Sequence, residues 1–376
     1  MQTIGDLEEL MDLIAPPRLA EDWDNVGLLV GERSHPLQRV MLAIDLREDV
    51  LAEAISRNVD AIIAYHPPIF KPLRRIDDST PTGRVLLGAM SAGIAIHSPH
   101  TAADAAEGGV NDWLARGLGA GQLEALTPST ESRPGEDVKI VTFCPEDAVE
   151  GIRNALATAG AGLIGDYALC SFEVPGTGTF HGAESTNPAV GQSGSLQRIS
   201  EIRLEMVCAR TDLSRAIAYL RDAHPYEEPP VEIHPLEEQP TRRQGAGRML
   251  HLEHPATFTD LAENIRTHLA TGRLIGSEPA PGRLHAQVGV CAGSGGELLD
   301  EAMARGCTLF LTGELRHHDV LKAIDGQCAV LLAGHTNTER GWLKGLRTRL
   351  HKALNDGEEK VEVFQSETDV DPLRSL

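Results

Sequence analysis

The sequence predicts an α/β protein: a discontinuous, mostly parallel α/β domain into which an α+β ferredoxin-like domain is inserted. At both ends of the chain, short apolar segments alternate with helical segments of roughly ten to fifteen residues, which is typical of βαβ units. Polar, turn-rich linkers at 127–135 and 237–247 interrupt this alternation. Two strand–helix–strand units between the linkers indicate a split βαβ module. The predicted domains are 1–130 with 245–376, and 135–240.

The first part of the chain is predicted from its capping residues and its prolines. Thr3 is suited to cap an amphipathic helix that Pro16 and Pro17 end. Strands are expected at 27–31, 40–46, 59–65 and 93–97, with helices at 49–55 and 83–90. Pro67 and Pro68 cannot donate ladder hydrogen bonds, so the strand 59–65 must end at His66. His66 is therefore expected at the carboxyl edge of a parallel sheet, where open α/β sheets bind their ligands.

The later elements follow the same periodicity argument. The insertion is expected to have strands at 138–143, 167–174, 201–208 and 231–236, helices at 146–159 and 213–223, and a loop at 176–194. Beyond it, strands at 288–291, 308–312, 329–333 and 361–364 are expected with helices at 297–305 and 338–350. Because strands and helices alternate again there, the chain returns to its first domain.

The composition limits the classes of function. The net charge of −21, from 55 acidic and 34 basic residues, argues against a sequence-independent nucleic-acid binder, which needs a basic face. The 6 cysteines form no C-x-x-C pair, so a thiolate zinc site is not indicated. Neither a signal peptide nor an apolar run of about 18 residues is visible. We therefore expect a cytoplasmic protein without a membrane partner.

Three predicted strand ends carry imidazole or carboxylate groups. His66 ends one strand, and the pairs His100 with Asp104 and His335 with Glu339 follow two others. Residues four apart lie on one face of a helix, so each pair can converge on a point beyond its strand. This donor set suits zinc, manganese or iron. Each pair alone is also common on protein surfaces, and a single histidine often caps a strand for packing reasons.

Several motifs of the chain together resemble a known family. In the outer domain they are Trp23-Asp24-Asn25-Val26-Gly27-Leu28, Tyr65-His66-Pro67-Pro68-Ile69-Phe70, Ser98-Pro99-His100-Thr101 with Asp104 and Gly108-Gly109-Val110-Asn111, and Gly334-His335 with Glu339. In the insertion they are Pro175-Gly176-Thr177-Gly178-Thr179-Phe180 and Ala223-His224-Pro225-Tyr226-Glu227-Glu228. The chain resembles the homologues of GTP cyclohydrolase 1 type 2, described as dinuclear-metal hexameric proteins.

The resemblance implies two divalent metal ions per subunit, with ligands at His66, Asp104, His335 and Glu339. Glu339 or Asp104 is the implied bridge between the ions. It also implies a homohexamer, and an insertion similar to small signalling and cation-tolerance proteins with a ferredoxin-like fold.

One position departs from the family pattern, because Tyr65 stands where many members have a second histidine. A neutral phenol is a poor zinc ligand, so one of the two metal ions is expected to be weakly held or absent. We hypothesise that His97, at the end of the neighbouring strand, partly replaces the missing imidazole; its alternative role is that of a core histidine. His318 resembles a histidine that the family keeps near its site, so the resemblance implies a role for it as an outer partner or proton donor.

These observations favour a divalent-metal-dependent hydrolase that resembles the family. The expected substrate is a small molecule such as a nucleotide or a related phosphorylated or heterocyclic compound. A metal-bound hydroxide is the expected nucleophile, with His318 or His100 moving the proton. The alternative is a non-catalytic metal-binding regulator or metal-delivery protein whose inserted domain senses a small ligand.

Overall fold

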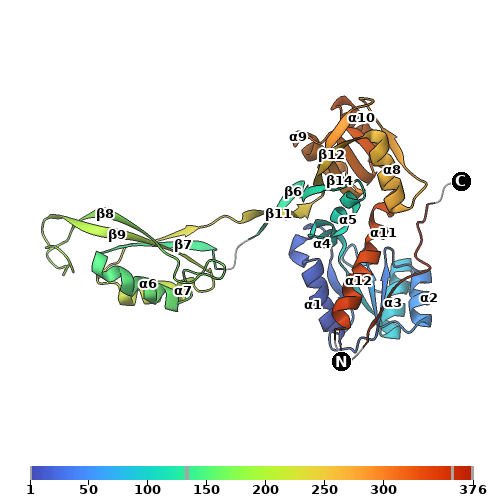
Figure 1. Ribbon diagram of the computed structural model, residues 1–376. Coiled ribbons are helices and arrows are strands. Elements are labelled where there is room, and N and C mark those ends of the chain that lie inside the picture. Colours follow the sequence, from blue (N-terminus) through green and yellow to red (C-terminus); the bar gives the residue numbers. More distant parts are fainter. Residues whose placement is uncertain (1, 132–134, 357–359, 374–376) are drawn as a thin grey trace. The chain divides into compact units, whose positions relative to one another are not determined.

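The chain has a mixed α/β fold in which several sheets are divided between two units (Figure 1). A computed structural model describes residues 2–131, 135–356 and 360–373. The first unit comprises Met1–Ser129 and Thr241–Leu376, and the second comprises Thr130–Pro240. Among the described residues, no helix has the length and apolar character needed to cross a membrane.

The first sheet of the first unit is mostly parallel. Its strand order is β1 (Gly27–Val30), β4 (Ala95–Ser98), β3 (Ala61–Ala64), β2 (Arg39–Ala43) and β17 (Glu362–Gln365). Only β1 and β4 pair in antiparallel fashion. Alternate residues of its strands pack against α2 (Glu48–Ser56) and α3 (Pro81–Ala92) on one face. The other face packs against α1 (Ile4–Ile14) and α12 (Trp342–Leu354).

The second sheet of this unit is mixed. Its order is β13 (Ile275–Ser277), β16 (Ala329–Leu332), β15 (Leu309–Glu314), β14 (Leu284–Ser294), β12 (Arg248–Thr257) and β5 (Gly121–Glu124). Only the β14–β15 and β15–β16 pairs are parallel. Around this sheet lie α5 (Val110–Arg116), α8 (Phe258–Leu269), α9 (Leu299–Ala304) and α10 (His317–Asp325). One buried cluster contains residues of both sheets, including Ile63 and Leu309. The strand ends of the two sheets are therefore held by a common core.

The second unit is one antiparallel sheet covered by two helices. It contains β7 (Val138–Cys144), α6 (Val149–Thr158), β8 (Phe172–His181), β9 (Leu196–Cys208), α7 (Leu213–Ala223) and β10 (Val231–Pro235), with strand order β10-β7-β9-β8. Ile140 and Leu204 on the sheet share a core with Ile152 and Leu220 on the helices. The unit thus has a hydrophobic core of its own.

Four sequence predictions about elements are wrong. The predicted linkers contain β6 (Thr127–Glu131) and β11 (Gln239–Ala246), which pair in a two-stranded sheet; linker residues 132–134 lie outside the described residues. Strand β8 begins at Phe172, not at 167, and occupies the start of the predicted loop. The predicted helix 338–350 is divided at Gly341 into α11 (Asn337–Arg340) and α12. The second sheet is mixed because β12, in a segment without predicted elements, pairs antiparallel on both sides.

Candidate metal centre

His66 stands where a buried parallel strand meets two prolines. All four residues of β3 are buried, and the backbone N–H groups of Tyr65 and His66 still donate to Ala43 O and Ile44 O, at 2.9 and 3.0 Å. The following prolines have no N–H to donate, so the chain leaves the sheet. The predicted place of His66, at the carboxyl end of β3, is confirmed.

The second histidine stands at a corresponding strand end in the other sheet. After β16, the N–H of Gly334 donates to Gly313 O at 3.0 Å, and Gly334 turns the chain with a φ of 87° that glycine adopts without strain. The Thr338 hydroxyl donates to His335 O at 2.6 Å and accepts from the Gly293 N–H at 2.8 Å. These bonds fix the turn between His335 and Glu339.

His66, His335 and Glu339 form a candidate metal-binding triad whose ligand atoms all lie within 4.8 Å of one another. Glu339 Oε2 lies 3.6 Å from His66 Nε2, and Glu339 Oε1 lies 3.3 Å from His335 Nε2. Glu339 is only 3% exposed, and its Oε2 has no hydrogen-bond partner. A buried carboxylate oxygen without a partner is costly, and a divalent cation between these three groups would satisfy it.

Each of three histidines is oriented by a carboxylate, and the sequence did not reveal this. Nδ1 of His66 donates to Asp45 at 2.9 Å, Nδ1 of His100 to Asp24 at 2.8 Å, and Nδ1 of His335 to Glu314 at 3.0 Å. A carboxylate on one ring nitrogen leaves Nε2 as the metal-ligating or proton-accepting atom. The available signal was weak: Asp45 follows β2, and Glu314 ends β15.

The electrostatics favour positive charge at this place. Burial opposes protonation of His66, but the hydrogen bond to Asp45 and the neighbouring carboxylate of Glu339 outweigh burial and raise the pKa of His66 to about 10. The hydrogen bond from His66 lowers the pKa of Asp45, against the effect of burial. For Asp24, burial is outweighed by bonds from His100 and Thr101, which lower its pKa to about 2. The surrounding carboxylates thus stabilise a cation, whether imidazolium or metal.

His100 and Asp104 lie on α4 (His100–Ala105), next to the triad. The ring centroid of His100 is 5.3 Å from that of His66. His100 also has a φ of 21°, and backbone strain of this kind is frequent at functional sites. Asp104 accepts a 2.5 Å hydrogen bond from the Tyr65 hydroxyl, and burial raises the pKa of Asp104 to about 7. The Tyr65 hydroxyl therefore uses one carboxylate oxygen of Asp104. Asp104 is not part of the triad.

Two other predicted residues are not brought into this arrangement. His318 is exposed in the first turn of α10, and its described ring contact is with His317. His97 is buried in β4, opposite Ile63 of β3, and neither ring nitrogen has a hydrogen-bond partner. The catalytic role of His318 and the metal-binding role of His97 stay predictions.

Burial of His97 predicts a pH dependence of stability. Burial lowers the pKa of His97 to about 4, so the unfolded chain binds this proton more tightly than the folded chain. The contribution of neutral His97 to the free energy of unfolding is constant above the ordinary pKa of about 6.5. It decreases as the pH is lowered from there to about 4, by about 3 kcal/mol in total. In a His97→Leu variant, urea unfolding between pH 7.5 and 5 is expected to show a smaller acid destabilisation than in wild type. The matched control is His254→Leu, at an exposed histidine; equal acid sensitivity of all three proteins would contradict the expectation.

The glycine-rich carboxyl end of β14 lies against the centre. Gly293 has a φ of 62°, and a Cβ there would meet Glu339 Oε1 at 2.9 Å and His335 Nε2 at 3.2 Å. A side chain at this position would therefore displace both groups. Glycine at this end of β14 therefore lets the backbone lie close to the triad.

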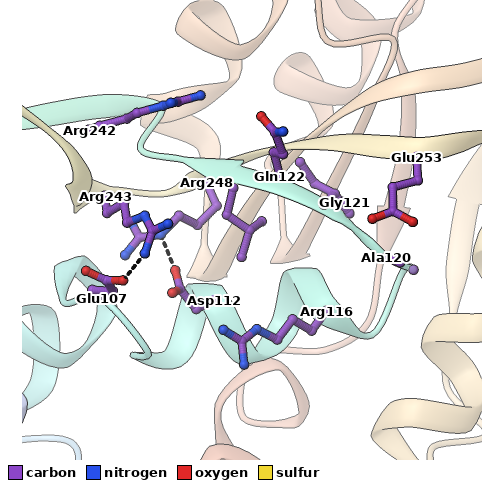
Figure 2. A pocket seen from close by; sticks show the side chains of 13 residues that line it. Glu107, Asp112, Arg116, Ala120, Gly121, Gln122, Arg242, Arg243, Arg248 and Glu253 are labelled. Atoms are coloured by element: carbon purple, nitrogen blue, oxygen red, sulfur yellow. Dashed lines mark hydrogen bonds and ion pairs between the residues drawn. The ribbon is translucent and has the colours of Figure 1, made fainter.

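Behind α4, a buried arginine fixes the end of the helix. Arg248 is fully buried and pairs with Asp112, as the dashed line in Figure 2 shows. Its guanidinium also donates to the carbonyls of Ala105 and Ala106, at 3.0 and 2.7 Å. Because these carbonyls end α4, Arg248 positions the helix that carries His100 and Asp104.

Together the fold and the site define a class: α/β proteins with a histidine–carboxylate centre at strand ends of two sheets that share a core. The chain belongs to the Duf34/NIF3 (NGG1p interacting factor 3) family, whose model matches residues 2–372. The resemblance predicted from the motifs is thereby confirmed.

Individual relatives cover nearly the whole chain. The Bacillus subtilis protein named "GTP cyclohydrolase 1 type 2 homolog" is 33% identical over 98% of this chain and 97% of its own length. The rat protein named "NIF3-like protein 1" is 35% identical over 98% of this chain and 92% of its own length. Among solved structures, a Bacillus cereus protein related to NIF3 is 29% identical, with a TM-score of 0.67, 100% of this chain and 99% of that chain covered. A Staphylococcus aureus protein is 26% identical, with a TM-score of 0.79 and the same coverage.

Proposed function

We propose that this protein is a divalent-metal-dependent hydrolase acting on a nucleotide or a related phosphorylated or heterocyclic substrate. The observation that carries the proposal is the triad, in which Glu339 is buried with an unpartnered oxygen between the Nε2 atoms of His66 and His335. The substrate class is supported by relatives whose names mention GTP cyclohydrolase.

The donor set fits zinc, manganese or iron, because imidazole and carboxylate suit all three. His66, His335 and Glu339 would hold one ion. Asp104 is the candidate ligand for a second ion, although the bond from Tyr65 already uses one of its oxygens. When bound, a divalent ion supplies Lewis acidity towards water and towards the electrophilic atom of the substrate.

The chain's own residues supply orientation and proton transfer. Asp24 holds Nδ1 of His100, so Nε2 of His100 is the atom that accepts or returns a proton. The pKa of Asp24 is lowered to about 2, so Asp24 stays ionised and keeps accepting the hydrogen bond that orients His100. Asp45 and Glu314 keep the other two imidazoles in the tautomer that ligates through Nε2.

The remaining finer proposals rest on the resemblance and on topology. The second unit is ferredoxin-like, which its order β10-β7-β9-β8 with two covering helices supports. The protein is a cytoplasmic homohexamer that binds neither nucleic acid nor membranes. Light scattering tests the assembly, since a monomer would remove this part of the proposal.

A metal-binding regulator is the second candidate, and a cavity in the second unit favours it. This cavity, of about 490 Å³, is lined by residues of both insertion motifs, among them Phe180 and Tyr226. Tyr226 donates to Glu201 at 2.8 Å in the same cavity. A partly open cavity with a largely apolar lining and a few polar groups is suited to a small ligand that the second unit would sense.

A turnover assay separates the two functions. Metal-loaded protein is incubated with a panel of nucleotides and phosphoesters, beside a His66→Ala/Glu339→Ala control. The hydrolase proposal expects product formation well above the control. Turnover equal to the control on every substrate would overturn it and leave the regulator.

A further inference from the structure

Two large aromatic side chains lie exposed beside the candidate metal centre. Trp23 is 56% exposed and Phe70 is 47% exposed, although side chains of this kind are usually well buried. Their ring centroids are 5.7 Å apart, with the planes tilted by 53°. The His100 ring centroid lies 6.0 Å from that of Trp23 and 6.4 Å from that of Phe70. The pair therefore offers exposed aromatic surface next to an imidazole of the centre.

The segments that carry the two rings are fixed to the centre and to each other. Asp24, the neighbour of Trp23, accepts the hydrogen bond from His100. The Asn25 side chain donates to Ile69 O at 2.6 Å, which ties this segment to the residue before Phe70. Because the two segments are already held, binding a planar group between or upon the rings orders little further structure.

Three basic residues follow Phe70 in the sequence. The basic residues are Lys71, Arg74 and Arg75, and all three are exposed. Within the described parts of the chain, none of them forms an ion pair, in a protein whose net charge is −21. Trp23 is preceded by the exposed acids Glu21 and Asp22, so an anionic group is favoured on the Phe70 side alone.

We propose that Trp23 and Phe70 bind the planar base of a nucleoside triphosphate, and that Lys71, Arg74 and Arg75 bind its phosphates. The inference rests on the proposed function, because it names the substrate class and the recognition residues of the same site. Base–aromatic stacking is tolerant of base identity, so the aromatic pair favours a base of any kind, and the basic residues favour a polyphosphate.

Equilibrium dialysis of the metal-loaded full chain tests this with four ribonucleoside triphosphates, guanosine and inorganic tripolyphosphate. Trp23→Ala and Phe70→Ala are each expected to weaken triphosphate binding by about 10-fold or more, the range for one stacked base, while Trp23→Phe retains most of it. Tripolyphosphate binding should not respond to Trp23→Ala. Lys71→Ala/Arg74→Ala should weaken triphosphate and tripolyphosphate binding and leave guanosine binding unchanged.

The matched control is Lys344→Ala/Lys352→Ala, which removes the same charge from exposed positions on α12. Unchanged triphosphate affinity in both aromatic variants, equal losses in the two charge variants, or no triphosphate binding by the wild type would each overturn the inference. Metal content is measured on every sample. Binding with these mutational effects but without turnover would overturn the hydrolase alone, whereas turnover that the aromatic variants leave unchanged would overturn the aromatic site alone.

Discussion

Replacing Glu339 with glutamine is expected to lower the affinity of the protein for divalent metal by about 100-fold or more. Loss of an outer hydrogen-bonding partner typically costs about 10- to 100-fold, and Glu339 contacts both imidazoles of the triad itself. Glutamine keeps the shape of the side chain but removes its charge. Metal per chain by elemental analysis, and competition with a chelator, measure the effect.

Unfolding of the Glu339→Gln variant shows whether weaker metal binding comes from loss of a ligand or from loss of the fold. Because the buried Glu339 has an unpartnered oxygen, the glutamine variant is expected to unfold in chelator no earlier than wild type. Glu314→Gln should weaken metal binding by about 10-fold, since it removes only the negative charge of the group that accepts from His335 Nδ1. Glu301→Gln, at an exposed position on α9, serves as the matched control. Wild-type metal affinity in Glu339→Gln would refute the triad.

Local chemistry made His66, His335 and Glu339 candidates from the sequence, although the same spacing also selected His100 and Asp104, which are outside the triad. Two prolines end the strand at His66, and the spacing of four places His335 and Glu339 on one face of a turn. The carboxylates that hold the imidazoles could not be predicted in this way. Asp45 is separated from His66 by 21 residues and Asp24 from His100 by 76, so only the folded chain shows the pairs.

The fold prediction failed where the composition of a strand is that of a linker. β6 and β11 are rich in threonine, proline, glutamine and arginine, so their composition is typical of linkers. Their strand structure comes from the partner strand and not from side-chain periodicity. β12 differs, because its Met249 and Leu250 are buried in two different core clusters, and it pairs antiparallel with a strand on either side. Tertiary context therefore decides these elements.

Replacing Arg248 with alanine is expected to destabilise the protein by about 3–5 kcal/mol, the range for breaking a buried ion pair. The change leaves Asp112 buried without its partner, and it deprives the Gly245 and Gly247 carbonyls of bonds at 2.8 and 2.7 Å. The carbonyls at the end of α4 lose their donors as well. Urea unfolding of the variant measures the loss, and Arg248→Lys, which keeps the charge but donates fewer bonds, should fall between alanine and wild type.

Arg243 provides the matched control, because Figure 2 shows it beside Arg248 with its own acidic partner. Its 2.5 Å ion pair with Glu107 is exposed on both sides, and exposed pairs are screened by water and salt. Arg243→Ala should therefore unfold like wild type. Since Arg248 acts on the centre through α4, Arg248→Lys should also bind metal more weakly than Arg243→Ala. Equal stability of the Arg248→Ala and Arg243→Ala variants would show that the buried pair does not hold this helix.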